Sequence, residues 1–179
     1  MADLEKLKHS LEERGFAVSC FDTAEEAADY LDAALDGKTI GIGGSVTIQE
    51  MGLAERLGRH NRILWHWAGG STQEAARAQV YVSSVNGAAE TGELVNIDGS
   101  GNRVASGLFG HEKVYFIVGQ NKIAPDYEAA LWRPGTSLPP ETPSAWASRP
   151  PAPPRGTAAT TVKVPSASAA PWWSIGRSP

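Results

Sequence analysis

The sequence predicts an α/β domain in which helices flank a mainly parallel β-sheet. Short apolar runs that suit buried strands alternate with amphipathic stretches that suit helices, and glycine-rich or polar loops separate them. The 179 residues, 41% of them hydrophobic, are enough for one domain with its own core. Strands that alternate with helices are typical of a parallel sheet that is covered on both faces.

The chain opens with a predicted helix over residues 3–14, where leucines recur at spacings of three and four and Gly15 provides a stop. Residues 16–21, "FAVSCF", read as a strand that follows this helix. Cys20 is the lone cysteine, so it has no partner for an internal disulfide, and we expect it to pack within this apolar run.

The middle of the chain continues the alternation. A second helix is predicted over residues 22–37, because Asp22 and Thr23 can cap it and acids fill its first turn. The elements expected next are a strand, glycine loop and helix over 38–58, a strand over 62–67, a short helix over 71–78 and a strand over 79–85. In the "WHW" end of the strand over 62–67, we expect Trp65 and Trp67 to point inward and His66 outward.

From Asn86 the pattern changes to short β pieces, predicted over residues 92–97 and 103–109. Residues 113–121 form the most apolar strand, and Pro125 opens a final helix over 125–133. The result is an α/β core with a compact β excursion near its end.

Composition excludes several classes of protein. A formal charge of −4 with mixed signs provides no basic face, which argues against nucleic acid as a partner. The apolar stretches are too short to cross a bilayer, and residues 1–15 read as a charged helix rather than a signal peptide. We therefore expect a cytoplasmic protein. The four histidines are scattered without metal-ligand spacing, and no residue stands out as a catalytic nucleophile.

The first candidate binding segment is "GIGGSVTIQE", residues 41–50. Gly43 and Gly44 permit a tight turn that brings backbone N–H groups close to a ligand, and Ser45 could cap the following helix or donate to an anion. No Gly-Lys-Ser/Thr follows, so it is not a Walker loop, and Val46 stands where a dinucleotide fingerprint has its third glycine. A simple strand-to-helix turn explains the segment equally well.

The second candidate is "LVNIDGSGNR", residues 94–103, whose polar side chains are crowded into one bend. A guanidinium beside amide and hydroxyl groups suits recognition of a carboxylate or phosphate, although Arg103 could instead pair with Asp98 and stiffen the loop. The candidate ligand-binding residues here are Asn96, Asp98, Gly99, Gly101, Asn102 and Arg103.

The third candidate is "GQNKIAPD", residues 119–126, at the end of the most apolar strand. Parallel sheets bind ligands beyond the carboxyl ends of their strands, which makes Asn121 and Lys122 candidates, with Lys122 as a counter-ion. An exposed lysine that only contacts solvent is the plain alternative. We expect the three loops to converge at one rim of the sheet and to form an anion-accepting hollow.

Three stretches, "GIGGSVTIQEMGL", "TGELVNIDGSGNRVA" and "FGHEKVYFIVGQNKIAPDYEAALWR", resemble in this order the LUD (lactate utilisation) domain family. The resemblance covers about residues 3–133. It implies a fold like that of the sugar-phosphate isomerase and CoA-transferase superfamily. It also implies a role in oxidising lactate to pyruvate, in multi-protein complexes whose partner subunits contain iron–sulfur clusters.

The composition changes at Arg133. Eleven of the 12 prolines lie at or after Pro134, and residues 134–179 carry only five charges. The codons of this tail permit a different frame, after loss of one base at Arg133, which continues the helix and encodes a four-cysteine cluster resembling the C-terminal segment of LUD relatives. We therefore interpret residues 1–133 as the LUD-like domain and 134–179 as a frameshifted, disordered tail rich in Pro, Ala and Ser. A proline-rich linker or partner-binding segment is the alternative.

These observations favour a LUD-type subunit of a lactate-oxidising system that binds a small carboxylate or phosphorylated ligand. The chain itself offers no cofactor or metal site, so redox chemistry requires a cofactor or a partner subunit. Two alternatives stay open: a non-catalytic assembly subunit, and a stand-alone isomerase or CoA-transferase-like enzyme with Glu50 or Glu90 as the nearest bases.

Overall fold

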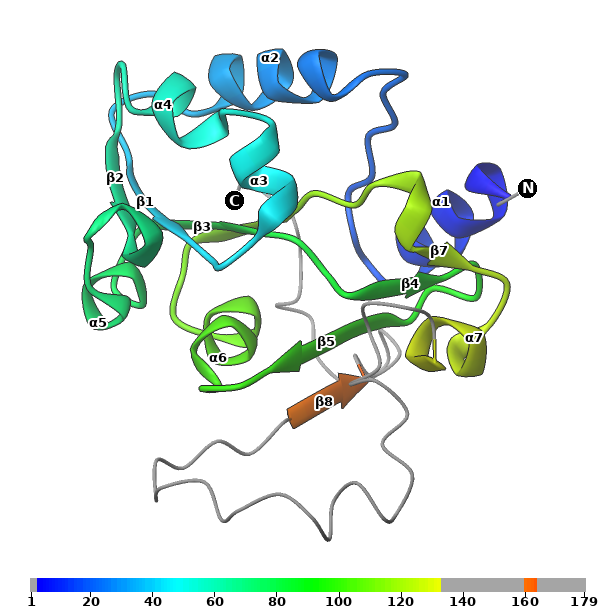
Figure 1. Ribbon diagram of the computed structural model, residues 1–179. Coiled ribbons are helices and arrows are strands. Elements are labelled where there is room, and N and C mark those ends of the chain that lie inside the picture. The colour runs from blue at the N-terminus through cyan, green and yellow to red at the C-terminus, as the bar shows by residue number, and fades with distance from the viewer. Residues whose placement is uncertain (1–2, 133–159, 164–179) are drawn as a thin grey trace, which may run out of the picture.

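The computed structural model describes residues 3–132 and 160–163, and it has the expected α/β architecture (Figure 1). Its first sheet contains four parallel strands in the order β2-β1-β3-β6. The strands of this sheet are β1 (Thr39–Ile42), β2 (Arg62–Trp65), β3 (Val80–Ser83) and β6 (Lys113–Phe116). Each crossover between neighbouring strands carries helical turns, as the alternating sequence pattern predicts.

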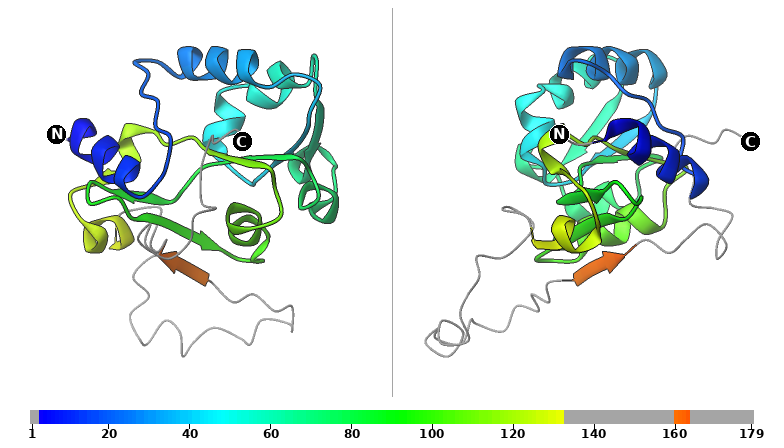
Figure 2. Two further views of the ribbon diagram at one scale, coloured as in Figure 1. Left: turned by 180° about the vertical axis from the view of Figure 1, so that it is seen from behind. Right: turned by 90° about the vertical axis from the view of Figure 1, so that its right-hand side faces the viewer.

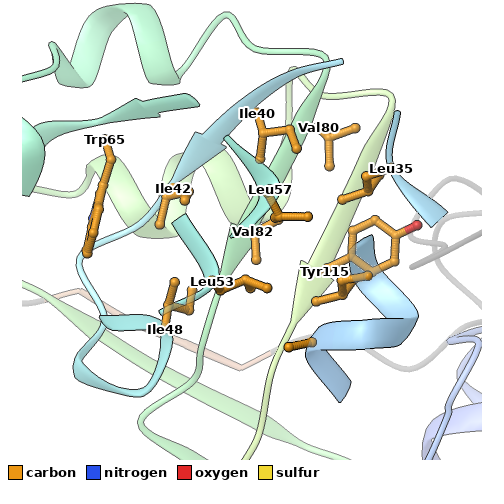
Figure 3. Packing of buried hydrophobic residues seen from close by; sticks show 12 residues of the cluster. Leu35, Ile40, Ile42, Ile48, Leu53, Leu57, Trp65, Val80, Val82 and Tyr115 are labelled. Atoms are coloured by element: carbon orange, nitrogen blue, oxygen red, sulfur yellow. The ribbon is translucent and has the colours of Figure 1, made fainter. Parts of the chain in front are cut away.

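One face of this sheet is covered by α2 (Ala24–Ala34), α3 (Val46–Glu50) and α4 (Leu53–Leu57). Ile40, Ile42, Val80 and Val82 point into this layer and pack with Leu53, Leu57 and Ile48 (Figure 3). Apolar side chains two residues apart on β1 and β3 share this face. The opposite face of the same strands carries Gly41, Gly43, Tyr81 and Ser83 and is covered by α5 (Thr72–Ala75) and α6 (Asn102–Leu108).

A second, smaller sheet has the order β7-β4-β5-β8. In it, β4 (Gly87–Ala89) and β5 (Leu94–Asp98) form an antiparallel hairpin, and β7 (Ile123–Ala124) pairs with β4 in parallel. α1 (Leu4–Glu13) packs its buried leucines against one side, and α7 (Tyr127–Trp132) contacts β4 and β7 (Figure 2). The two sheets meet where β3 passes into β4.

The strand β8 (Thr160–Lys163) pairs antiparallel with β5. These are the only described residues of the segment that we expected to be disordered, and they are extended and paired. The rest of that expectation, and the boundary at Arg133, lie outside the described residues and stay predictions. Within the described part of the chain no helix is long and apolar enough to cross a membrane.

Three sequence predictions are wrong. Residues 16–21 form no strand, and Cys20 is exposed, because no strand of either sheet pairs with this segment. Residues 103–109 belong mostly to α6 rather than to a β piece. The predicted strand over 62–67 ends at Trp65 and turns into the 3-10 helix η1 (His66–Ala68), so that Trp65 is 8% exposed but Trp67 is 47% exposed.

The helices α2 and α4 are joined by ion pairs that centre on two cations. Arg56 on α4 donates to Glu25, at 2.8 Å, and to Asp29 on α2. His60, just beyond α4, lies 2.8 Å from Asp32 and 3.1 Å from Asp36. Hydrogen bonds with Asp32 and then Asp36 raise the pKa of His60 above its ordinary value of 6.5, and the bond with His60 is the main cause that lowers the pKa of Asp32.

His60 should therefore make stability depend on pH. A raised pKa in the folded state means that the protonated ring stabilises the fold below about pH 6.5, and that this contribution is lost as the pH rises through the folded pKa. We expect His60→Gln to lower the urea midpoint more at about pH 5.5 than at about pH 9, measured by circular dichroism. An equal effect at both pH values would contradict this assignment.

Candidate functional site

The candidate site lies at the carboxyl ends of β1 and β3, where the glycine loop Gly43–Ser45 leaves β1. The N–H of Gly43 donates to the carbonyl of Val82 at 3.0 Å, which holds the loop against β3. A Cβ atom on Gly43 would lie 2.5 Å from Ser83 Oγ and 2.8 Å from the Tyr81 hydroxyl. Close approach of the backbone to these hydroxyls therefore requires glycine.

Ser45 is buried and caps α3, because its Oγ accepts from the N–H of Ile48 at 3.4 Å. The helix that it caps has only five residues. This geometry matches the strand-to-helix turn that the sequence left open as an alternative. Ser45 thus shapes the loop, and its hydroxyl is already engaged as an acceptor.

Arg103 on α6 connects the second sheet to this loop. Its Nη1 donates to the carbonyl of Gly44 at 3.2 Å, and its Nη2 donates to Asn86 Oδ1 at 2.7 Å and to the carbonyl of Ile97. Asn86 Oδ1 also accepts from the N–H of Ile97 at 3.0 Å. The guanidinium fork therefore holds three acceptors from three segments, and it acts as a brace between β5 and the glycine loop.

Asp98 caps α6 rather than pairing with the Arg103 guanidinium. Its Oδ2 accepts from the N–H groups of Arg103, at 2.7 Å, and Val104, at 3.2 Å, and its Oδ1 accepts from Ser100 N–H at 3.1 Å. Partial burial alone would raise the pKa of Asp98, but these N–H groups outweigh it and hold the pKa below its usual range. The carboxylate stays charged at neutral pH and fixes the start of α6.

Lys122 approaches the same loop from the other side. It ends the 3-10 helix η2 (Gln120–Lys122), and its Nζ donates to Thr47 Oγ1 at 2.9 Å and to Ser84 Oγ at 2.6 Å. Ser84 is 1% exposed and donates in turn to the carbonyl of Ile117 at 2.6 Å. An ammonium group is therefore held by two hydroxyls, one on α3 and one directly after β3.

Asn96 on β5 is 8% exposed, and its Oδ1 is a buried acceptor without a hydrogen-bond partner among the described residues. Because side chains alternate along a strand, Asn96 shares a face of β5 with Leu94, which packs with Val85 and Ile123. Val85 and Ile123 directly follow Ser84 and Lys122 in the chain. A buried carbonyl oxygen without a donor costs about 1–3 kcal/mol, so a group that donates to it would be favoured at this place.

Tyr81 lines the α6 side of the sheet beneath the loop. Burial raises the pKa of its phenol to about 12, against the influence of Arg103 and of a hydrogen bond with Ser106. The phenol is therefore neutral throughout the physiological range. It contributes a fixed hydroxyl below Gly43 and does not take or release a proton there.

The structure puts the predicted site residues in four places. Gly43, Gly44 and Ser45 form the glycine loop, Arg103 donates to Gly44, and Lys122 donates to Thr47 at the start of α3. Asn96 is buried on β5. Asp98, Gly99, Gly101 and Asn102 form the start of α6, where Gly101 has a φ of 81° and Gly99 is exposed. Asn121 is exposed on η2, with its Oδ1 beside Gly119.

Sequence reasoning noted Thr47 as a possible donor beside Ser45, and Asn86 among the polar residues near Arg103, but it missed Tyr81 and Ser84. Ser83 and Ser84 carried a usable signal, because two polar residues ended an otherwise buried strand. Among residues 3–132 and 160–163 no group of three or more His, Cys, Asp or Glu side chains is placed to hold a metal ion.

Comparison with known proteins identifies one family. The family model of the LUD domain matches residues 4–152, which is most of the chain and continues past Arg133. No curated protein and no solved structure matches the chain significantly. The matched range includes every loop that contributes to the site.

Proposed function

The chain belongs to the LUD domain family, and from this premise we propose that it is a cytoplasmic component of a system that oxidises lactate to pyruvate. In this proposal, the chain binds a small hydroxy-carboxylate or related anion at the glycine loop. The observation that carries the proposal is the Lys122 ammonium group, which two hydroxyls hold beside α3, directly after the glycine loop. The buried Oδ1 of Asn96 on β5, which has no hydrogen-bond partner among the described residues, supports it.

The chemistry of these groups suits a ligand that carries both a negative charge and a hydrogen-bond donor. The Lys122 ammonium supplies positive charge, and Thr47 and Ser84 fix its position. Asn96 Oδ1 would accept from the ligand's hydroxyl group. Arg103 keeps the loop in place and is not counted as a group that contacts the ligand.

Oxidation of lactate removes two electrons and two protons from its carbinol group. The described side chains of the site bind and orient, and we assign the electron acceptor to iron–sulfur partner subunits of the complex. In this scheme the chain presents its ligand to a partner. The isolated chain should therefore bind lactate or pyruvate, but lactate should be oxidised only when the chain is part of the complex.

The test is the affinity for lactate, pyruvate and inorganic phosphate, measured by isothermal titration calorimetry. We expect Lys122→Met to weaken binding of the preferred anion about tenfold or more, because a charge-assisted hydrogen bond contributes about 1.5–3 kcal/mol. Lys38→Met is the matched control, because Lys38 precedes β1 at the opposite end of the sheet. Equal affinities of the wild type and Lys122→Met would overturn the proposal.

A second candidate is a non-catalytic assembly subunit. It is favoured by the engagement of Arg103, Asp98 and Ser45 in holding loops rather than in open donors. Affinity purification from a lactate-metabolising host separates the two. An assembly subunit would co-purify with partners and bind none of the small molecules, whereas the first candidate would do both.

A further inference from the structure

The turn after β2 presents three consecutive aromatic residues in different environments. Trp65 is buried beside Ile42 and Ile48 (Figure 3), His66 is half-buried, and Trp67 is 47% exposed. The rings of Trp65 and Trp67 are 5.6 Å apart, and His66 meets Trp67 edge-on at 6.0 Å. A large, half-exposed indole fixed by two neighbouring rings is a rigid surface rather than a mobile side chain.

The backbone prevents this turn from burying Trp67. Gly69 adopts a φ of 84°, and the N–H of Gly70 donates to the carbonyl of Trp65 at 2.8 Å. A Cβ atom on Gly70 would lie 2.8 Å from the same carbonyl. The two glycines therefore close the turn tightly and hold Trp67 at the surface.

Trp67 lies directly against the glycine loop. A Cβ atom on Gly44 would be 3.3 Å from Trp67 Cζ2 and 3.4 Å from His66 Cε1. The carbonyl of the same Gly44 accepts from Arg103. Val46, two residues further along, is 58% exposed. The indole thus borders the loop on which Lys122 and Arg103 converge.

Two ring nitrogens of this turn are buried and have no hydrogen-bond partner within the described part of the chain. They are Nε1 of Trp65, which is always a donor, and Nδ1 of His66. Native proteins rarely leave such atoms unsatisfied, so this turn is expected to take up a further polar group such as a bound water. Because both nitrogens are buried, a planar ligand can contact the exposed face of Trp67 directly but not these nitrogens.

We propose that Trp67 is a stacking platform for a planar heteroaromatic ring that carries a phosphate, that is, for a nucleotide-type ligand. The ring lies on the exposed face of Trp67, on the side of the turn that borders the glycine loop. The phosphate is directed along the loop toward Lys122. The stacking face is additional to the hydroxy-anion site, but the phosphate shares Lys122 with that site, so this part of the proposal rests on the proposed function.

The experiment compares ligands with and without the ring. Adenosine monophosphate and flavin mononucleotide are titrated against ribose 5-phosphate, by calorimetry and by quenching of tryptophan fluorescence. We expect at least one of the two nucleotides to bind about tenfold or more tightly than ribose 5-phosphate, because stacking of a base on an aromatic side chain has this magnitude. Trp67→Ala should remove this gain, and Trp67→Phe should keep most of it.

Trp132→Ala is the control, because Trp132 is 70% exposed on α7, outside the turn and the loop. Unfolding midpoints of all variants show whether Trp67→Ala still folds, and Trp67→Phe tests the platform independently. Two results would overturn the proposal: no preference for a nucleotide over ribose 5-phosphate, or a preference that survives Trp67→Ala. A different result would show that the anion site is wrong: the wild type and Lys122→Met would then bind ribose 5-phosphate with equal affinity.

Discussion

Arg103→Met is expected to lower the free energy of unfolding by about 2–4 kcal/mol, since it removes three hydrogen bonds to part-buried acceptors at once. These are the carbonyls of Gly44 and Ile97 and the side chain of Asn86. Methionine preserves much of the packing of the arginine stem, so the loss reports the hydrogen bonds. Urea denaturation followed by circular dichroism measures it.

Two variants sharpen this prediction. Arg103→Lys keeps the charge but offers no planar fork, so it should recover only part of the lost stability. Arg59→Met should be close to neutral, because Arg59 is exposed and makes no side-chain hydrogen bond among the described residues. If Arg103→Met were as stable as the wild type but failed to bind the anion, Arg103 would contact the ligand rather than brace the loop.

Gly41→Ala is expected to cost about 1–3 kcal/mol or to prevent folding altogether. A Cβ atom there would lie 2.5 Å from the carbonyl oxygen of Ala75 and 3.1 Å from Tyr81 Cδ2. The first of these is backbone at the end of α5, so relief requires α5 to move away from β1. Loss of the native thermal transition, or a lower midpoint, measures the effect.

Gly99→Ala is the matched control for this substitution. Gly99 lies in the loop before α6 and does not have a positive φ, and a Cβ atom added there would meet no described atom within 4 Å. Its stability should stay within about 0.5 kcal/mol of the wild type. A similar loss in both variants would mean that the contact with Ala75 does not determine the cost.

The parallel sheet and its helices could be predicted because their signals are local. The capping box of Thr23 and Glu26 starts α2 as the sequence indicates, and the apolar run at 79–85 contains β3. The prediction for residues 103–109 is wrong because their apolar side chains suit a strand as well as a helix. The conformation of this segment is decided by Asp98, whose carboxylate caps α6 across the turn at Gly101.

The candidate site was only partly predictable for a different reason. Parallel topology brings the ends of β1 and β3 to one rim, so the sequence could anticipate that Ser45, Arg103 and Lys122 would approach each other. Which of them stay open to a ligand depends on distant acceptors. Arg103 is bound by a carbonyl 59 residues away, and no local pattern reveals such a contact.

The hydrogen bond between Arg103 and Gly44 also determines how small a fragment of this fold can be and still keep the glycine loop in place. Arg103 on α6 is itself positioned by Asn86, Ile97 and Asp98, which lie in or beside the hairpin of the second sheet. A fragment limited to the four parallel strands and their covering helices would keep α6 but lose these partners, and the bend after β1 would lose its support. A minimal engineered derivative must therefore keep the hairpin and α6 together with the larger sheet, even though neither supplies the ammonium group. The candidate site and the contact between the two sheets therefore cannot be separated from each other.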